Sequence, residues 1–131
     1  MKFFLLGICL AAAATMLSAQ DESNFPQWMR TINGQMGALR KIEAKTGPEA
    51  AEAAKKISDA YSQMSAYWTS KSVEDAVKLS KTGQMAADEL AAAAAAGDSE
   101  KATAAYKQIG GTCQGCHQAH REKTENGFKI K

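Results

Sequence analysis

Five residues near the carboxyl end of the chain, Cys113-Gln114-Gly115-Cys116-His117, form a C-x-x-C-H motif. This motif is typical of the covalent attachment of haem c. Two thiols form thioether bonds with the vinyl groups of the porphyrin, and the imidazole ligates the iron from the proximal side. Residues three and four apart share one face of an α-helix, so the spacing suits a helix that presents both thiols and the imidazole together. The motif therefore predicts one haem c, bound to a helix through Cys113, Cys116 and His117.

Two other interpretations of the motif fit the sequence less well. A structural zinc site needs four convergent ligands, and the nearby candidates are Cys113, Cys116, His117 and His120. Because Cys116 and His117 diverge by about 100° on a helix, these residues cannot close a tetrahedron alone. A thioredoxin-type redox pair would follow a strand in a βαβ pattern, which this sequence lacks. Haem attachment is therefore the preferred interpretation.

The amino terminus has the pattern of a secretory signal peptide. Lys2 precedes an apolar stretch from Phe3 to Leu17, and small residues end the segment at Ala19. We expect cleavage after Ala19, which divides the chain into a signal peptide, residues 1–19, and one cytochrome domain, residues 20–131. Leu17 is an imperfect residue for its place before the cut, so an uncleaved membrane anchor is the alternative. Either way the folded part is exported, and we expect a periplasmic location.

Cysteine content and charge narrow the possible partners. Cys9 lies in the predicted signal peptide, so the mature chain keeps Cys113 and Cys116, and haem attachment would consume both thiols. A formal net charge of +2 indicates neither nucleic acid nor an anionic membrane as a partner. After cleavage, no apolar stretch is long enough to span a bilayer. The expected partners are therefore redox proteins, whose identity the sequence does not reveal.

Turn signals separate the first two predicted helices. The first helix is predicted over residues 24–45, with Ser23 or Asn24 as its cap. Gly47 then ends it, and Pro48 suits the first turn of a second helix over residues 48–68.

Capping signals mark the other two helices. Ser72, with Asp75 three residues later, resembles a capping box for a third helix that runs to Ala96. Gly97 is a stop signal and Asp98 caps the fourth helix, which carries the C-x-x-C-H motif. Four helices, short joints and no strands predict an all-α, antiparallel up-down-up-down four-helix bundle with haem c on its last helix.

Apolar residues recur at helical spacing, and we expect them to face one core. Gly110 and Gly111 lack side chains, which would let the porphyrin lie against the backbone there. The residues expected to point inward are Met29, Ile32, Met36, Leu39, Ala50, Ala53, Ala54, Ile57, Ala60, Tyr61, Met64, Tyr67, Met85, Ala102, Ala105, Ile109, Cys113, Cys116 and His120.

The segment from Ala92 to Lys123 resembles the last helix of the class II cytochromes c, the cytochrome c′ family. It shares Tyr106, Ile109-Gly110-Gly111, the C-x-x-C-H motif and Arg121 with that helix. The first helix matches more weakly, through Met29, Met36, Gly37, Leu39 and Ile42. The resemblance implies a four-helix bundle with a single haem, and a homodimer through the first two helices.

The chain also departs from the family pattern. His120 stands where an aromatic residue is common, and Phe25 replaces an arginine one turn before the distal position. The joint between the second and third helices is shorter than usual. Trp28 and Phe25 are expected to pack around the distal edge of the haem, with Trp68 as another candidate.

The resemblance places Met29 on the distal side of the haem, opposite His117. Low-spin members of the family carry a ligating methionine there, whereas cytochromes c′ carry leucine or phenylalanine. Our preferred reading is a low-spin electron carrier, not an enzyme, with His117 and Met29 as axial ligands. The alternative is a five-coordinate haem that binds nitric oxide or carbon monoxide, with Met29 as a steric plug. Methionine is also a common core filler, so packing alone is a third reading of Met29.

Arg121 resembles the proximal arginine of the family. It lies one turn beyond His117, where its side chain would screen the imidazole or contact a haem propionate. The alternative is a solvated charge on an exposed face.

Overall fold

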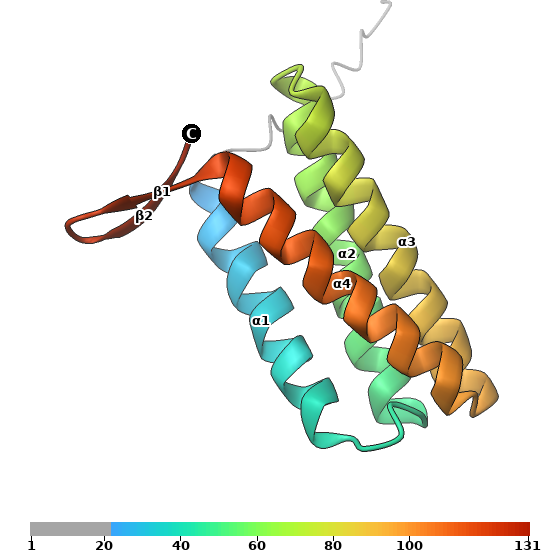
Figure 1. The fold of residues 1–131 in the computed structure, drawn as a ribbon. Helices are drawn as coiled ribbons and strands as arrows, with labels where there is room; N and C mark the ends of the chain where they lie inside the picture. The colour runs from blue at the N-terminus through green and yellow to red at the C-terminus, as the bar shows by residue number, and fades with distance from the viewer. Residues whose placement is uncertain (1–21) are drawn as a thin grey trace, which may run out of the picture.

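The computed structural model describes residues 22–131, which form four long helices and a short C-terminal hairpin (Figure 1). The predicted signal peptide lies outside these residues. The helices are α1 (Phe25–Lys41), α2 (Pro48–Ser70), α3 (Glu74–Ala96) and α4 (Ser99–His120). A 3₁₀ turn, η1 (Glu22–Asn24), precedes α1. The predicted four-helix bundle with the C-x-x-C-H motif on its last helix is confirmed.

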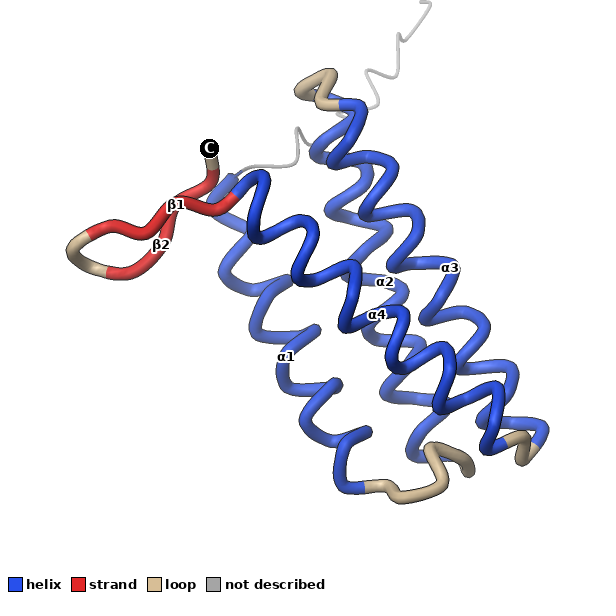
Figure 2. Tube along the Cα trace, in the orientation of Figure 1, coloured by secondary structure: helices blue, strands red, loops and turns tan. Residues whose placement is uncertain are grey.

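The helices do not pack equally on one another. Helix α2 packs along α3, α3 packs along α4, and α1 packs along α2, whereas the backbones of α1 and α4 hardly approach each other. The tube view shows α1 and α4 on the same side of the bundle, with α2 and α3 behind them (Figure 2). The bundle is therefore closed on the α2–α3 side and less tightly joined between α1 and α4.

Small side chains line the contact between α2 and α3. Many of the buried residues on these two helices are alanines, and Gly83 of α3 meets the ring of Tyr61 from α2. A Cβ atom at Gly83 would lie 2.5 to 2.8 Å from three atoms of that ring, so the aromatic side chain requires a glycine here. The buried alanines are Ala50, Ala53, Ala54 and Ala60 of α2 and Ala76, Ala86, Ala87, Ala93 and Ala94 of α3.

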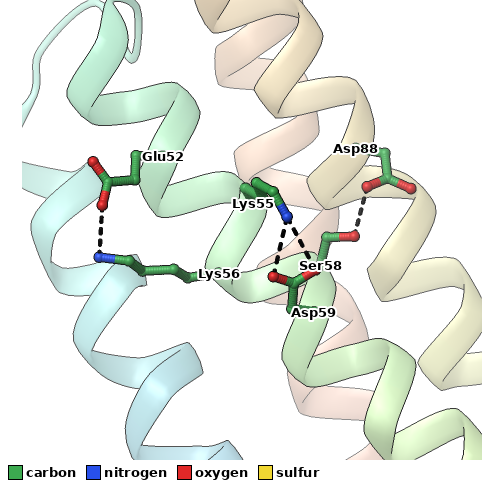
Figure 3. Close-up of polar contacts among 6 residues, drawn as sticks. All are labelled: Glu52, Lys55, Lys56, Ser58, Asp59 and Asp88. Carbon is green, nitrogen blue, oxygen red and sulfur yellow. Dashed lines mark hydrogen bonds and ion pairs between the residues drawn. The ribbon is translucent and has the colours of Figure 1, made fainter.

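Figure 3 shows polar contacts of α2, of which the one made by Ser58 involves a buried side chain. Ser58 donates a hydrogen bond to Asp88 and so links α2 with α3. The other two pairs shown, Lys55 with Asp59 and Lys56 with Glu52, are exposed and one turn apart on α2. Exposed pairs of this kind contribute about 0.3–0.5 kcal/mol each. The bundle is therefore held together by buried apolar contacts rather than by surface charge.

Helix α1 ends at Lys41, four residues before the predicted end. Ile42 is extended, and its N–H bonds the Leu39 carbonyl oxygen at 3.1 Å. Lys45 then adopts a positive φ of 56°; its ammonium group bonds the Ile42 carbonyl oxygen and lies 4.8 Å from the centre of the Tyr106 ring. This contact with α4 fixes the chain reversal and explains why the helix stops early.

The predicted capping box before α3 was wrong. Ser72 has a positive φ of 57° and lies outside the helix, so Val73 takes the cap position, where no side-chain capping bond forms. Asp75 instead pairs with His120 of α4. The short Ser-x-x-Asp signal was overridden by a tertiary contact.

The joint between α3 and α4 follows its sequence signals. Gly97 is left-handed, with a φ of 73°, and ends α3. The Asp98 carboxylate accepts a hydrogen bond from the Lys101 backbone N–H at 3.1 Å and so caps α4. Both signals are local, which is why they could be read without the rest of the fold.

The prediction that the chain contains no strands was wrong. Strands β1 (Arg121–Thr124) and β2 (Gly127–Ile130) form an antiparallel hairpin directly after α4. Gly127 follows the two-residue turn and has a φ of 136°, a conformation that glycine adopts most readily. The Lys131 N–H bonds the His120 carbonyl oxygen at 3.0 Å, which ties the end of the hairpin to the end of α4.

Most of the predicted inward face is correct. All eight residues named on α2 are buried, as are Ile32, Leu39, Ala102, Ala105 and Ile109. Met85 is the exception, with 60% of its surface exposed. The α3 face toward the core is filled instead by smaller side chains, so Met85 lies on the outer side of the helix.

Candidate haem-binding site

A cavity of about 830 Å³ opens between α1, α2, α4 and the hairpin. All five predicted site residues, Met29, Cys113, Cys116, His117 and Arg121, line it. Pockets for small organic ligands and cofactors commonly span about 300–1,000 Å³, so this cavity lies in the upper part of that range. The remaining lining residues are Glu22, Ser23, Phe25, Pro26, Ile32, Asn33, Tyr61, Met64, Trp68, His120, Phe128, Lys129 and Ile130.

Helix α4 presents the C-x-x-C-H motif to the cavity. The helix continues to His120, so Cys113, Cys116 and His117 lie on adjoining turns, as their spacing predicted. Both thiols are free and half-buried. Burial raises the pKa of the Cys116 thiol to about 11, and the nearby Cys113 and Asp75 add to this shift. The Cys116 thiol therefore stays protonated near neutral pH and is not a preformed thiolate ligand for a metal.

The imidazole of His117 is held in its neutral form. Burial lowers its pKa below the usual value, and the positive charge of Arg121 lowers it further. Neutral imidazole is the form that donates a lone pair to a metal. The environment of His117 therefore suits the role of an axial ligand.

Helix α1 supplies an apolar wall to the cavity. Phe25, Met29 and Ile32 line it, and Met64 of α2 extends the same apolar surface. Met29 is half-buried and packs against the core. Met36, two turns further along α1, packs against the core and does not line the cavity, in agreement with its predicted core role.

Tyr61 places a hydroxyl group beside the first cysteine. Its oxygen lies 3.4 Å from the Cys113 sulfur, close enough for a hydrogen bond. Burial, together with the neighbouring cysteines, raises the pKa of Tyr61 well above its usual value, so its hydroxyl stays protonated. From its sequence pattern Tyr61 is predicted only as a core residue, because a contact across 52 positions leaves no local signal.

His120 is largely buried, with 12% of its side chain exposed. Its Nε2 atom lies 2.7 Å from an Asp75 carboxylate oxygen, and its ring centre lies 5.0 Å from that of Trp68. The hydrogen bond from His120 lowers the pKa of Asp75. His120 therefore joins the end of α4 to the beginning of α3 and the end of α2.

Arg121 begins the hairpin rather than continuing the helix. Its guanidinium lies 3.9 Å from the centre of the Phe128 ring, a cation–π contact across the hairpin. The positive charge of Arg121 also lowers the pKa of His117, so the guanidinium lies near the C-x-x-C-H motif.

The glycine pair Gly110 and Gly111 does not line the cavity. Both residues are exposed, and a Cβ atom at either position would meet no neighbour within 4 Å. The expectation that the porphyrin lies against this part of the backbone is therefore not supported.

The cavity fits a haem covalently attached to α4. Helix α4 contributes two thiols and a neutral imidazole to the lining, and the lining residues of α1 and α2 are largely apolar, as a porphyrin requires. By contrast, no group of three or more histidine, cysteine, aspartate or glutamate residues within 22–131 is arranged to hold a metal ion directly. This argues against the zinc interpretation of the same motif.

Comparisons with known proteins agree with this site. A family model described as Cytochrome C′ matches residues 68–121, which include the C-x-x-C-H motif. Over these residues the chain is similar to the cytochrome c′ family. The matched segment contains Cys113 and Cys116, the two cysteines expected to attach haem c. The match does not extend to Met29, so it does not distinguish the low-spin subgroup from the other members of the family.

The fold comparison supports the bundle. The structure is similar to the crystal structure of cytochrome c′ from Thermochromatium tepidum, with a TM-score of 0.62 and 22% sequence identity. The similarity covers 88% of this chain and 98% of the other chain. The comparison with curated proteins gave no match. Within residues 22–131, no helix is long and apolar enough to cross a membrane.

Proposed function

We propose that this cytochrome binds a small gaseous ligand, nitric oxide or carbon monoxide, on the distal side of its haem and transforms no substrate. The family model is described as Cytochrome C′, and that description carries this proposal, because the resemblance to cytochromes c′ implies a haem iron whose sixth position is open. The family description favours gas binding over the electron-carrier function that we preferred from the sequence. When bound, haem supplies an iron whose distal position can accept a diatomic ligand.

The residues on the α1 side of the cavity suit this function. Phe25, Ile32 and Met64 offer an apolar surface that excludes water and binds an uncharged diatomic molecule better than an ion. In this proposal Met29 limits access by its size, as the leucine or phenylalanine of related proteins does. His117 holds the proximal side, with its imidazole kept neutral by burial.

The electron carrier remains the second candidate, because the Met29 side chain lines the same cavity as His117. A thioether is a soft ligand that favours ferrous haem, and His/Met ligation raises the reduction potential. In that case the distal position is closed and the haem edge exchanges electrons with partner proteins.

The optical and electron paramagnetic resonance spectra of the oxidised protein separate the two candidates. Gas binding predicts high-spin iron without a methionine–iron charge-transfer band near the red end of the spectrum. Replacement of Met29 by Leu should then leave the spin state unchanged, and Met29→Ala should speed carbon monoxide binding. If the unaltered protein is low-spin and Met29→Leu makes it high-spin, Met29 is a ligand and the carrier function is correct.

We also propose that the protein works in the periplasm as a homodimer that associates through α1 and α2. The family resemblance and the predicted signal peptide support this proposal. Sedimentation equilibrium of the mature protein should give twice the monomer mass, whereas a monomer at micromolar concentration would contradict the dimer.

A further inference from the structure

The indole N–H of Trp68 lacks a partner. Trp68 lies near the end of α2, is only 4% exposed and lines the cavity, yet its Nε1 atom forms no hydrogen bond with any residue in the described part of the chain. Buried N–H groups are almost always bonded in native proteins, since an unbonded one loses its hydration without compensation. Ser80 has the other unpartnered buried polar atom among these residues, but it does not line the cavity.

The aromatic neighbours of Trp68 hold its indole ring in place. Ring centres of Phe25, Tyr67 and His120 lie 5.4, 5.1 and 5.0 Å from that of Trp68. His120 is in turn bonded to Asp75. Because residues of three helices pack around this ring, it cannot rotate far enough to reach another acceptor in the protein. The acceptor must therefore be a group that enters the cavity.

The charges at this end of the cavity favour an anionic acceptor. Arg121 and Lys129 of the hairpin line the cavity and carry positive charge, and Arg121 directly follows His120. The negative groups in this region are Glu22, which also lines the cavity, Glu122, which pairs with Lys129 at 3.3 Å, and Asp75 on His120. Two of these three carboxylates already have partners, whereas Arg121 has no carboxylate partner among the ion pairs of residues 22–131.

We propose that Trp68 donates its indole N–H to a propionate carboxylate of the bound haem, and that Arg121, which has no carboxylate partner among the ion pairs of residues 22–131, stabilises the charge of this carboxylate. The propionates are the anionic groups of haem c, and they leave the porphyrin edge away from the vinyl positions that bond to Cys113 and Cys116. The inference rests on haem attachment and holds for either a gas-binding or an electron-carrying protein.

Trp28 provides a matched control. Its indole N–H is donated to the Gln63 side-chain oxygen at 2.8 Å, and Trp28 does not line the cavity. The variants Trp68→Phe and Trp28→Phe each remove one indole N–H and keep an aromatic ring. Only Trp68→Phe should change the pKa of the haem propionate.

The first measurement is an NMR titration of the ¹⁵N-labelled holoprotein. The Trp68 indole N–H signal should be protected from solvent exchange. Its chemical shift should change over the same pH range in which the midpoint potential of the haem iron shows its inflection. The Trp28 signal should not follow that inflection. The titration uses the unaltered protein, so it tests the proposal even if Trp68→Phe folds poorly.

The second measurement is the pH dependence of the midpoint potential in the two variants. A hydrogen bond to an ionised carboxylate favours the ionised form, so its removal in Trp68→Phe should move the inflection upward by about one to two pH units. Trp28→Phe should leave the inflection in place. An unchanged inflection in Trp68→Phe, or a Trp68 indole signal that exchanges rapidly and ignores pH, would overturn the proposal.

Discussion

Helices α2 and α3 pack on one another through small side chains, whereas α1 and α4 both line a cavity and their backbones hardly approach each other. Between α2 and α3, alanines and Gly83 fill the contact, so the packing there does not need a ligand. On the side of α1 and α4, aromatic and sulfur-containing side chains surround a volume of about 830 Å³. We therefore expect α2 and α3 to keep their arrangement without haem, and the placement of α1 relative to α4 to depend on it.

Removal of the attachment cysteines should have the largest effect. The double variant Cys113→Ala/Cys116→Ala should lose covalently bound haem completely, because no thioether can form. Acid-acetone extraction measures the loss directly, and hydrogen exchange should show α1 and α4 less protected while α2 and α3 keep most of their protection. Uniform loss of protection over all four helices would contradict the division of the bundle into two halves.

The proximal ligand is tested by His117→Ala. The variant should keep its thioether bonds but lose the native optical spectrum, because the imidazole next to Cys116 is the residue best placed to ligate the iron. A native-like spectrum would move the ligand role elsewhere, with His120 as the first residue to examine.

A methyl group at Gly83 tests the tight half of the bundle. Gly83→Ala would place its Cβ within 2.8 Å of the buried Tyr61 ring, and overpacking of this kind costs about 1–3 kcal/mol. Gly110→Ala and Gly111→Ala are matched controls on α4, where the added carbon would meet no neighbour. They should stabilise the helix by about 0.5–1 kcal/mol each through better helix propensity.

Chemical denaturation of the holoprotein measures these differences in the free energy of unfolding. Equal destabilisation by Gly83→Ala and by the α4 variants would show that something lies against Gly110 and Gly111 after all. It would also remove the contrast between the two sides of the bundle.

The smallest predicted effect concerns the contact between Asp75 and His120. The folded-state pKa of Asp75 is lowered, chiefly by the hydrogen bond from His120, so its contribution to stability is present above the usual aspartate pKa. That contribution is lost as pH falls through the lowered value. Asp75→Asn should therefore flatten the pH dependence of the melting temperature in the acid range below about pH 4 and change it little near neutrality.

The wild-type melting curve provides the comparison for this variant. Identical acid profiles for the two proteins would show that the Asp75–His120 contact does not contribute to stability.

The parts of the structure that could be predicted depend on local signals. Gly97 and Asp98 stop and start helices through backbone geometry and one side-chain bond, and the C-x-x-C-H motif needs only helical spacing. Apolar residues at helical spacing identified the buried face of α2, because that helix packs against its neighbours on a broad surface.

The missed features depend on contacts between distant residues. The early end of α1 needs the contact between Lys45 and Tyr106, and the environment of His120 needs Asp75 and Trp68. The hairpin did have a local signal, Asn126-Gly127, but strands of four residues give little alternation to support it. The role of Met29 could not be settled in the same way, because position on a helix face does not distinguish a ligand from a packing residue.

Carbon monoxide binding to the unaltered, reduced protein tests the proposed function most directly. If Met29 only restricts access to the distal position, ferrous protein should bind carbon monoxide in a simple saturable reaction, with the loss of a high-spin spectrum. A low-spin ferrous spectrum that stays unchanged under saturating carbon monoxide would contradict gas binding. That result would support Met29 as the sixth iron ligand of an electron carrier whose distal position is closed.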